Sequence, residues 1–270
     1  LIKSFSSTLS KMAKCFSQKV DSVSSSDYHY RQHKDLMRCG FKQHYPLTLA
    51  LLLRDNSASE EEEVREILGI IESVYVRYIL VGGLRPNTFE HMFAAWSKKA
   101  TEVDNLQKLI AKIKSDIGDV AEPEMFKERF SEISPQTKVA TYLLSRIERH
   151  ENGKVDEISD FVSARAVPII PNSLYSFLSD DWQSMCTSER YAAGIASKIG
   201  NLFLIQEERV RMWPTSETPS EQNDKLLENA GNMHHSKSTI EDLGGVFYSS
   251  SIESRGVSLS ESADQIWKIF

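Results

Sequence analysis

The 270-residue sequence has few cysteines, no long apolar run and no excess of positive charge. Its three cysteines, Cys15, Cys39 and Cys186, are odd in number and widely spaced, so they form neither a metal-type pair nor a disulfide framework. The longest apolar candidate, Leu47 to Leu53, is far shorter than the roughly eighteen residues of a membrane span. We therefore predict a cytoplasmic protein with no membrane partner.

The sequence also lacks an initiating methionine and a signal peptide, and it opens at Leu1 directly in an amphipathic pattern. We expect it to be a fragment of a longer protein. Its hydrophobic content of 40% and charged content of 26% are ordinary for a globular protein. The length suffices for one large domain or two ordinary ones.

The net charge of −6 is unevenly distributed along the chain. Residues 1–54 carry nine Lys and Arg against three Asp, whereas residues 151–270 carry ten Lys and Arg against eighteen Asp and Glu. A domain that grips DNA through its phosphates normally shows a basic stripe, so the C-terminal part does not indicate strong DNA affinity. The front segment from Tyr28 to Lys42 interleaves aromatic and basic residues, which is typical of nucleic-acid binding. The alternative there is a loop with a basic edge.

The first 150 residues repeat apolar side chains at spacings of three and four, which predicts amphipathic helices. Pro46 suits the first turn of one helix, and Gly82-Gly83 ends another. The run Glu60–Glu63 is explained by the dipole of a helix N-terminus better than by metal binding. The expected helices cover residues 1–16, 45–54, 57–81, 86–96, 106–117, 126–130 and 139–147.

After His150 the pattern changes. Residues 151–154 are a turn signal, and the segments 161–170 and 199–205 are typical of short strands. Short helices are expected at 219–229 and 259–270. The predicted fold is therefore mainly α: a helical array over residues 1–150, followed by a small α+β domain over residues 151–270.

Several short stretches together carry a family resemblance. In the helical part they are YPLTLALL at 45–52, IESVYVRY at 71–78 with Gly82 and PNTF at 86–89, and YLLSRIE at 142–148. In the second part they are VPIIP at 167–171, GNL at 200–202, IESR at 252–255 and QIW at 265–267. These stretches resemble the GmrSD family of modification-dependent restriction and anti-phage defence proteins. The resemblance implies that residues 151–270 form an HNH-like ββα domain, and that the family's nucleotide-hydrolysing domain is missing from this sequence and is a candidate partner.

The resemblance aligns Pro168 with the general-base histidine of an HNH nuclease and Val167 with the carboxylate beside it. Such a site needs a base that takes a proton from water and a hard divalent cation that offsets charge on the phosphate. Proline cannot take a proton, and valine cannot bind a metal ion. The family's downstream asparagine ligand falls in the region of Arg209 to Arg211. We therefore expect a degenerate site with no metal ligands and no cofactor.

Other candidate site residues have two interpretations each. Asn201 is either the residual position of the HNH site or an ordinary asparagine in a turn. A basic group around the motif either contacts DNA phosphates or forms a mixed, solvated surface with neighbouring acidic residues. His234 and His235 either replace lost metal ligands or lie in a solvated loop. The basic group consists of Lys198, Arg209, Arg211 and Lys225.

The favoured hypothesis is a pseudo-nuclease that binds DNA or a partner subunit of a restriction or anti-phage assembly without cutting DNA. The first alternative is an active metal-dependent HNH endonuclease or nickase that uses Mg²⁺ or Mn²⁺ and a histidine elsewhere, such as His150 or His234. The second is a structural interaction module. We expect the favoured interpretation to hold only if Pro168 and Asn201 lie together in one ββα unit.

Overall fold

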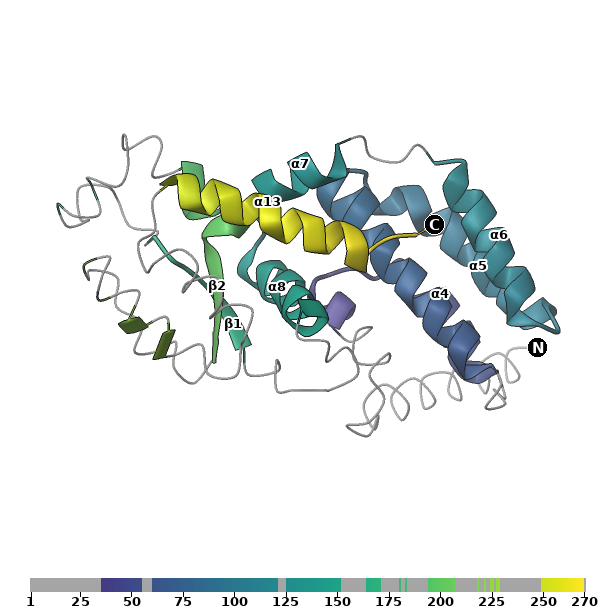
Figure 1. The fold of residues 1–270 in the computed structure, drawn as a ribbon. Helices are drawn as coiled ribbons and strands as arrows, with labels where there is room; N and C mark the ends of the chain where they lie inside the picture. The colour runs from purple at the N-terminus through teal and green to yellow at the C-terminus, as the bar shows by residue number, and fades with distance from the viewer. Residues whose placement is uncertain are drawn as a thin grey trace. The chain divides into compact units, whose positions relative to one another are not determined.

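The computed structural model describes residues 35–54, 60–120, 125–151, 164–170, 180, 183, 194–206, 218, 221, 224–225, 227–228 and 249–269. These residues form a mainly helical structure with one small two-stranded sheet, which confirms the predicted mainly α class (Figure 1). Packing divides the chain into two units. Unit 1 comprises Leu1–Glu124 with Trp267–Phe270, and unit 2 comprises Met125–Ile266.

The units do not coincide with the two domains expected from the sequence. Residues 125–150 pack with the strands in unit 2, whereas the sequence pattern grouped them with the helical array. The units are groups of packed elements and are not shown to be independent domains. The boundary at residue 150 therefore stays a prediction.

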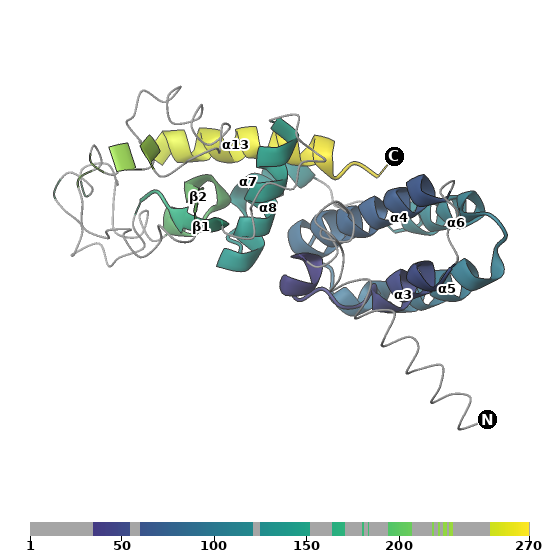
Figure 2. The same ribbon diagram turned by 90° about the horizontal axis from the view of Figure 1, so that it is seen from below.

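Unit 1 is built from helices that pack in pairs, with α3 beside α5 and α4 beside α6 (Figure 2). Pro46 lies in the first turn of α3, and the side chain of Asn105 caps α6 by accepting a 2.6 Å hydrogen bond from the Gln107 amide. Three glutamates, Glu61–Glu63, stand in the first turn of α4, as predicted from the helix dipole. The elements are α3 (Tyr45–Leu53), α4 (Glu61–Ser73), η2 (Val74–Val81), η3 (Pro86–Phe89), α5 (Glu90–Glu102) and α6 (Leu106–Gly118).

Buried aromatic rings hold these helix pairs together. Phe93 contacts Phe41 and Trp96 edge to face, with ring centroids 5.8 and 5.2 Å apart. The Trp96 indole donates a 2.8 Å hydrogen bond to Asp116 of α6, so its polar edge is satisfied inside the core. Arg54, just after α3, donates to the backbone carbonyls of Ala100 and Val103 at 2.7 and 2.8 Å. These bonds tie α3 to the C-terminal end of α5.

The second half of the long helix in unit 1 differs from the prediction. The spacing predicted one α-helix up to the glycines, but Val74–Val81 forms a π-helix that continues α4. All seven residues from Glu72 to Tyr78 are buried, so the helix there has no solvent face. Packing around it, including Tyr75 on Phe41 at 5.0 Å, favours the wider helix over the locally preferred α form. The glycines end it as expected, with Gly83 at φ 71°.

Unit 2 places three helices around the strand pair. Helix α13 packs on α7, α8 and η6, and α8 packs against both strands (Figure 1). The strand β1 ends at Pro168, whereas the predicted segment ran to residue 170, and residues 161–163 of that segment lie outside the described residues. Ile199–Asn201, predicted as strand, forms a 3₁₀ turn. The elements are α7 (Phe126–Glu132), α8 (Thr137–Glu151), β1 (Ala164–Pro168), η6 (Ile199–Asn201), β2 (Leu202–Gln206) and α13 (Ser249–Ile266).

Some predicted features lie outside the described residues. They are the helix at 1–16, the aromatic and basic residues from Tyr28 to Lys34, and two of the cysteines, Cys15 and Cys186. The described residues of the segment 219–229 have helical backbone. None of the helices that the structure describes is both long and apolar enough to cross a lipid bilayer.

The backbone of Met125 at the start of α7 yields a testable prediction. Its φ of 61° and ψ of 39° are left-handed, and its side chain is 60% exposed, so little packing offsets this strain. Asparagine tolerates this conformation better than methionine, so Met125→Asn should raise the free energy of unfolding by about 1 kcal/mol. The measurement is the midpoint of urea unfolding. Met125→Ala, which keeps a Cβ, should show no gain, and equal midpoints for both variants would contradict the explanation.

Candidate functional site

The antiparallel pair β1–β2 brings the two halves of the predicted motif together. Pro168 is the last residue of β1 and lies opposite Leu202, the first residue of β2. Asn201 immediately precedes Leu202, and its carbonyl accepts a 2.7 Å hydrogen bond from the Ile169 amide. Two segments about thirty residues apart in the sequence therefore meet at one end of the hairpin (Figure 1).

The side chain of Asn201 holds this end of the hairpin closed. It is fully buried, and its Oδ1 accepts a hydrogen bond from the Ile170 amide at 2.8 Å. Its Nδ2 donates to the carbonyls of Ile170 and Ala196, at 3.1 and 2.9 Å. The side chain thus satisfies three buried backbone groups. Asn201 therefore stabilises the turn, and its amide is engaged with backbone. Its assignment as the residual position of an HNH site stays a prediction.

A buried arginine of α13 holds the same turn from the other side. Arg255 Nη1 donates to the carbonyls of Gly200 and Leu202, at 2.7 and 2.6 Å. Burial lowers the pKa of Arg255 to about 10, and the nearby Glu148 opposes this shift, so the guanidinium stays charged at neutral pH. A charged donor makes stronger hydrogen bonds to these carbonyls than a neutral one.

Glycine allows α13 to approach this closely. A Cβ on Gly200 would collide with the carbonyl oxygen of Ile252 and lie 3.0 Å from the amide nitrogen of Gly256. A Cβ on Gly256 would in turn meet the carbonyl oxygen of Ser131 in α7 at 3.0 Å. The backbones of η6, α13 and α7 therefore pack against one another with no side chain between them.

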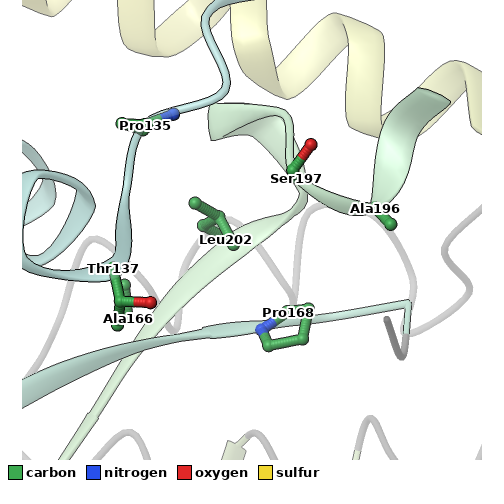
Figure 3. Close-up of a pocket in the computed structure, with 7 residues that line it drawn as sticks. All are labelled: Pro135, Thr137, Ala166, Pro168, Ala196, Ser197 and Leu202. Atoms are coloured by element: carbon green, nitrogen blue, oxygen red, sulfur yellow. The ribbon is translucent and has the colours of Figure 1, made fainter. Parts of the chain in front are cut away.

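A cavity of about 180 Å³ lies beside Pro168 (Figure 3). Alternation along β1 puts Ala166 and Pro168 on one face of the sheet, and Leu202, opposite Pro168, shares that face. The loop before α8 and the turn before η6 supply the walls. The seven lining residues are Pro135, Thr137, Ala166, Pro168, Ala196, Ser197 and Leu202.

The chemistry of this lining is neutral. None of its seven side chains is ionisable, and its side-chain polar groups are the hydroxyls of Thr137 and Ser197. Hydroxyls can donate to and accept from a ligand, but they are poor proton acceptors at neutral pH without an adjacent base. The cavity can therefore hold a polar group or water, whereas its side chains offer no general base.

The predicted basic group is only partly described. Lys198 lies in the turn beside Ser197 and forms a 2.7 Å ion pair with Glu132 of α7. Lys225 is half-buried in helical backbone. Arg209 and Arg211 lie outside the described residues, as do His234 and His235. The positions of Lys198 and Lys225 do not show whether either binds a phosphate, so the nucleic-acid role of the basic group stays a prediction.

The metal and catalytic alternatives centre on histidines. His150, at the end of α8, lies with a ring nitrogen 3.4 Å from Oε1 of Gln265. Among the residues with described side chains, no group of three or more His, Cys, Asp or Glu is arranged to hold a metal ion. Metal binding and metal-dependent cleavage stay predictions.

Sequence reasoning missed the buried charges of unit 2. Arg146, Glu148 and Arg149 on α8 are all less than a tenth exposed. Burial, and then repulsion from Arg149, lowers the pKa of Arg146 to about 9. One signal was present: Arg146 and Arg149 follow Tyr142 at spacings of four and three, which places them on a face that is otherwise apolar. Arg255 belongs to the IESR stretch of the resemblance, but it lies before the helix predicted at 259–270, and nothing in the sequence indicated its burial in α13.

The amide of Asn201 generates a stability prediction. Asn201→Ala removes the partner of three buried backbone groups and should lower the free energy of unfolding by about 3 kcal/mol. Asn105→Ala is the matched control, because that asparagine makes one exposed capping bond worth about 1 kcal/mol. Urea unfolding followed by circular dichroism measures both. Equal losses of unfolding free energy in the two variants would contradict the larger stabilisation assigned to the buried Asn201 side chain.

The close backbone contact of Gly200 with α13 generates a second stability prediction. Gly200→Ala forces a methyl group against the backbone of α13 and should cost about 1–3 kcal/mol of stability. Gly194→Ala, where a Cβ meets nothing within 4 Å, should leave stability unchanged or slightly raised. Thermal unfolding of both variants distinguishes a tight backbone contact from a general intolerance of alanine in this segment.

Comparison with known proteins adds no relative. No protein-family model, no curated protein and no solved structure matches the chain. A function must therefore be argued from the hairpin, from the contacts of Asn201 and Arg255 with its turn, and from the cavity beside Pro168.

Proposed function

We propose that this protein is a GmrSD-like defence protein whose unit 2 is an HNH-like ββα scaffold that binds DNA, or a partner subunit on DNA, without cutting it. The proposal is supported by the antiparallel pairing of β1 and β2, which places Pro168 of the VPIIP segment opposite Leu202 of the GNL segment. It rests on the family resemblance together with this geometry, since fold alone does not imply function.

One observation carries the non-cutting part of the proposal. Pro168, aligned with the general base, contributes its ring to the wall of the neutral cavity beside the hairpin. Val167, aligned with the neighbouring carboxylate, is buried with 4% of its surface exposed. Hydrolysis of a phosphodiester at neutral pH needs an activated water and an offset for phosphate charge. Neither aligned side chain supplies one.

The binding part of the proposal is supported by two lysines that adjoin residues of the cavity lining in the sequence. Lys138 follows Thr137, and Lys198 follows Ser197, so each lies next in sequence to a hydroxyl of the lining. Lysines placed in this way contact phosphates without reading sequence. The ion pair of Lys198 with Glu132 competes with such a contact, which predicts modest affinity with strong salt dependence.

A cleavage assay tests the non-cutting part. The purified chain is incubated with supercoiled plasmid, modified and unmodified, in the presence of Mg²⁺ or Mn²⁺, and we expect no nicked or linear product. Nicking that is lost in His150→Ala or His234→Ala would contradict the proposal and establish an active nuclease with a base elsewhere in the chain.

A binding assay tests the other part. Fluorescence anisotropy with a duplex should show binding at low salt, and Lys198→Gln should weaken it about threefold to tenfold and reduce the salt slope by about one. Lys108→Gln is the control, because Lys108 forms a similar ion pair with Asp104, at 2.9 Å, in unit 1. No binding of the wild-type chain to DNA at low salt would reject the DNA role and favour a structural interaction module.

A further inference from the structure

Unit 1 takes one of its buried side chains from the far end of the chain. Trp267, the first residue after α13, has no exposed surface and packs with unit 1. Its indole Nε1 donates a 3.0 Å hydrogen bond to Oε1 of Glu72. Glu72 is 2% exposed, so its carboxylate depends on donors inside the protein. An indole N–H is a donor only, and this pairing satisfies both groups.

Glu72 stands at the start of the unusual segment of unit 1. The π-helix begins two residues later, at Val74, and runs for eight residues. π-helices are rare beyond a single turn because their hydrogen-bond geometry and packing are poorer than those of the α-helix. The local backbone therefore favours the α form, and the surroundings of the segment must hold it in the wider form.

Those surroundings include aromatic contacts. Tyr75 stacks on Phe41, and Tyr78 contacts Phe89 edge to face at 5.6 Å. Both aromatic contacts come from elements close to the segment in unit 1. Trp267 is also part of unit 1, but it comes from the point at which the chain returns from unit 2. It directly follows the last residue of α13.

We propose that Trp267 is a latch: its docking on Glu72 holds residues 74–81 in the π register, and its release lets them relax to the α register. The change has a defined hydrogen-bond signature. In the docked state the Gly82 amide donates to the carbonyl of Arg77, and the Leu84 amide donates to the carbonyl of Tyr78. In the α register Gly82 donates to Tyr78 instead, and Leu84 loses its acceptor.

The latch gives unit 1 a two-state element. A register change in a buried helix turns its side chains, here Tyr75 and Tyr78, to new positions, so the states are discrete. Because Trp267 follows the last residue of α13 directly, any event that alters the end of that helix acts on the latch through the chain. The proposal stands on the contacts of unit 1 and does not rest on the nuclease-like scaffold.

The first test uses the wild-type protein. Hydrogen exchange measured by NMR gives the opening free energy of the Trp267 indole proton and of the Gly82 and Leu84 amides. The latch predicts the same protection for all three, within about threefold, because one event opens them. An indole proton that exchanges ten or more times faster than the two amides relative to their intrinsic rates would overturn the proposal, since undocking would then leave the π-helix intact.

The second test removes the donor and keeps the ring. Trp267→Phe should lower protection of the Gly82 and Leu84 amides about tenfold relative to amides of α5, as expected for losing one hydrogen bond to a buried carboxylate. Trp96→Phe is the matched control, because it deletes the same indole–carboxylate bond to Asp116 and should leave Gly82 and Leu84 unchanged. A uniform loss across unit 1 in Trp267→Phe, or no loss at the two amides, would show that Trp267 only contributes to stability.

Discussion

The turn that precedes β2 in unit 2 depends on the hydrogen bonds of one buried guanidinium, that of Arg255. Carbonyl oxygens of Gly200 and Leu202 converge on Arg255 in an environment closed to water. Without a donor these carbonyls would repel one another and stay unsatisfied. The hydrogen bonds of the charged guanidinium offset the cost of its desolvation, which lowers the pKa of Arg255. The nearby Glu148 offsets part of this cost as well. The position of Asn201, and through it the end of β1, follows from this contact.

The residues around this turn and the residue beside it serve different ends. Asn201, Gly200 and Arg255 interact with backbone, so their presence is explained by the fold of the hairpin. The side chain of Pro168 contributes to a cavity wall instead. The contacts of the Gly200-Asn201-Leu202 segment are structural, so this segment by itself is weak support for catalysis.

The sequence predicted well where local chemistry decides the structure. Pro46 and Gly83 mark helix ends because the residue itself restricts or permits the backbone geometry found there. Tertiary contacts decided the rest. The π register depends on packing around Glu72 to Tyr78, and the spacing of apolar residues in one sequence does not contain that packing.

The same division applies to the candidate site. The residue pattern predicts two short strands, whereas the proximity of Pro168 and Asn201 was expected only from the family resemblance. Their detailed contacts were not predicted. A side chain such as Asn201 reveals its partners only when Ile170 and Ala196 are brought to it. The neutral cavity depends on the loop before α8, whose place no pattern encodes.

The proline that ends β1 also affects how this hairpin meets other chains. The Ala166 amide points away from β2 and donates to Thr141 Oγ1 of α8 at 2.9 Å. Pro168, two residues on, faces the same outer edge and has no amide proton at all. A strand from another molecule would find one donor occupied and the next one absent along this edge. Pro168 thereby also protects a short, apolar strand against edge-to-edge association.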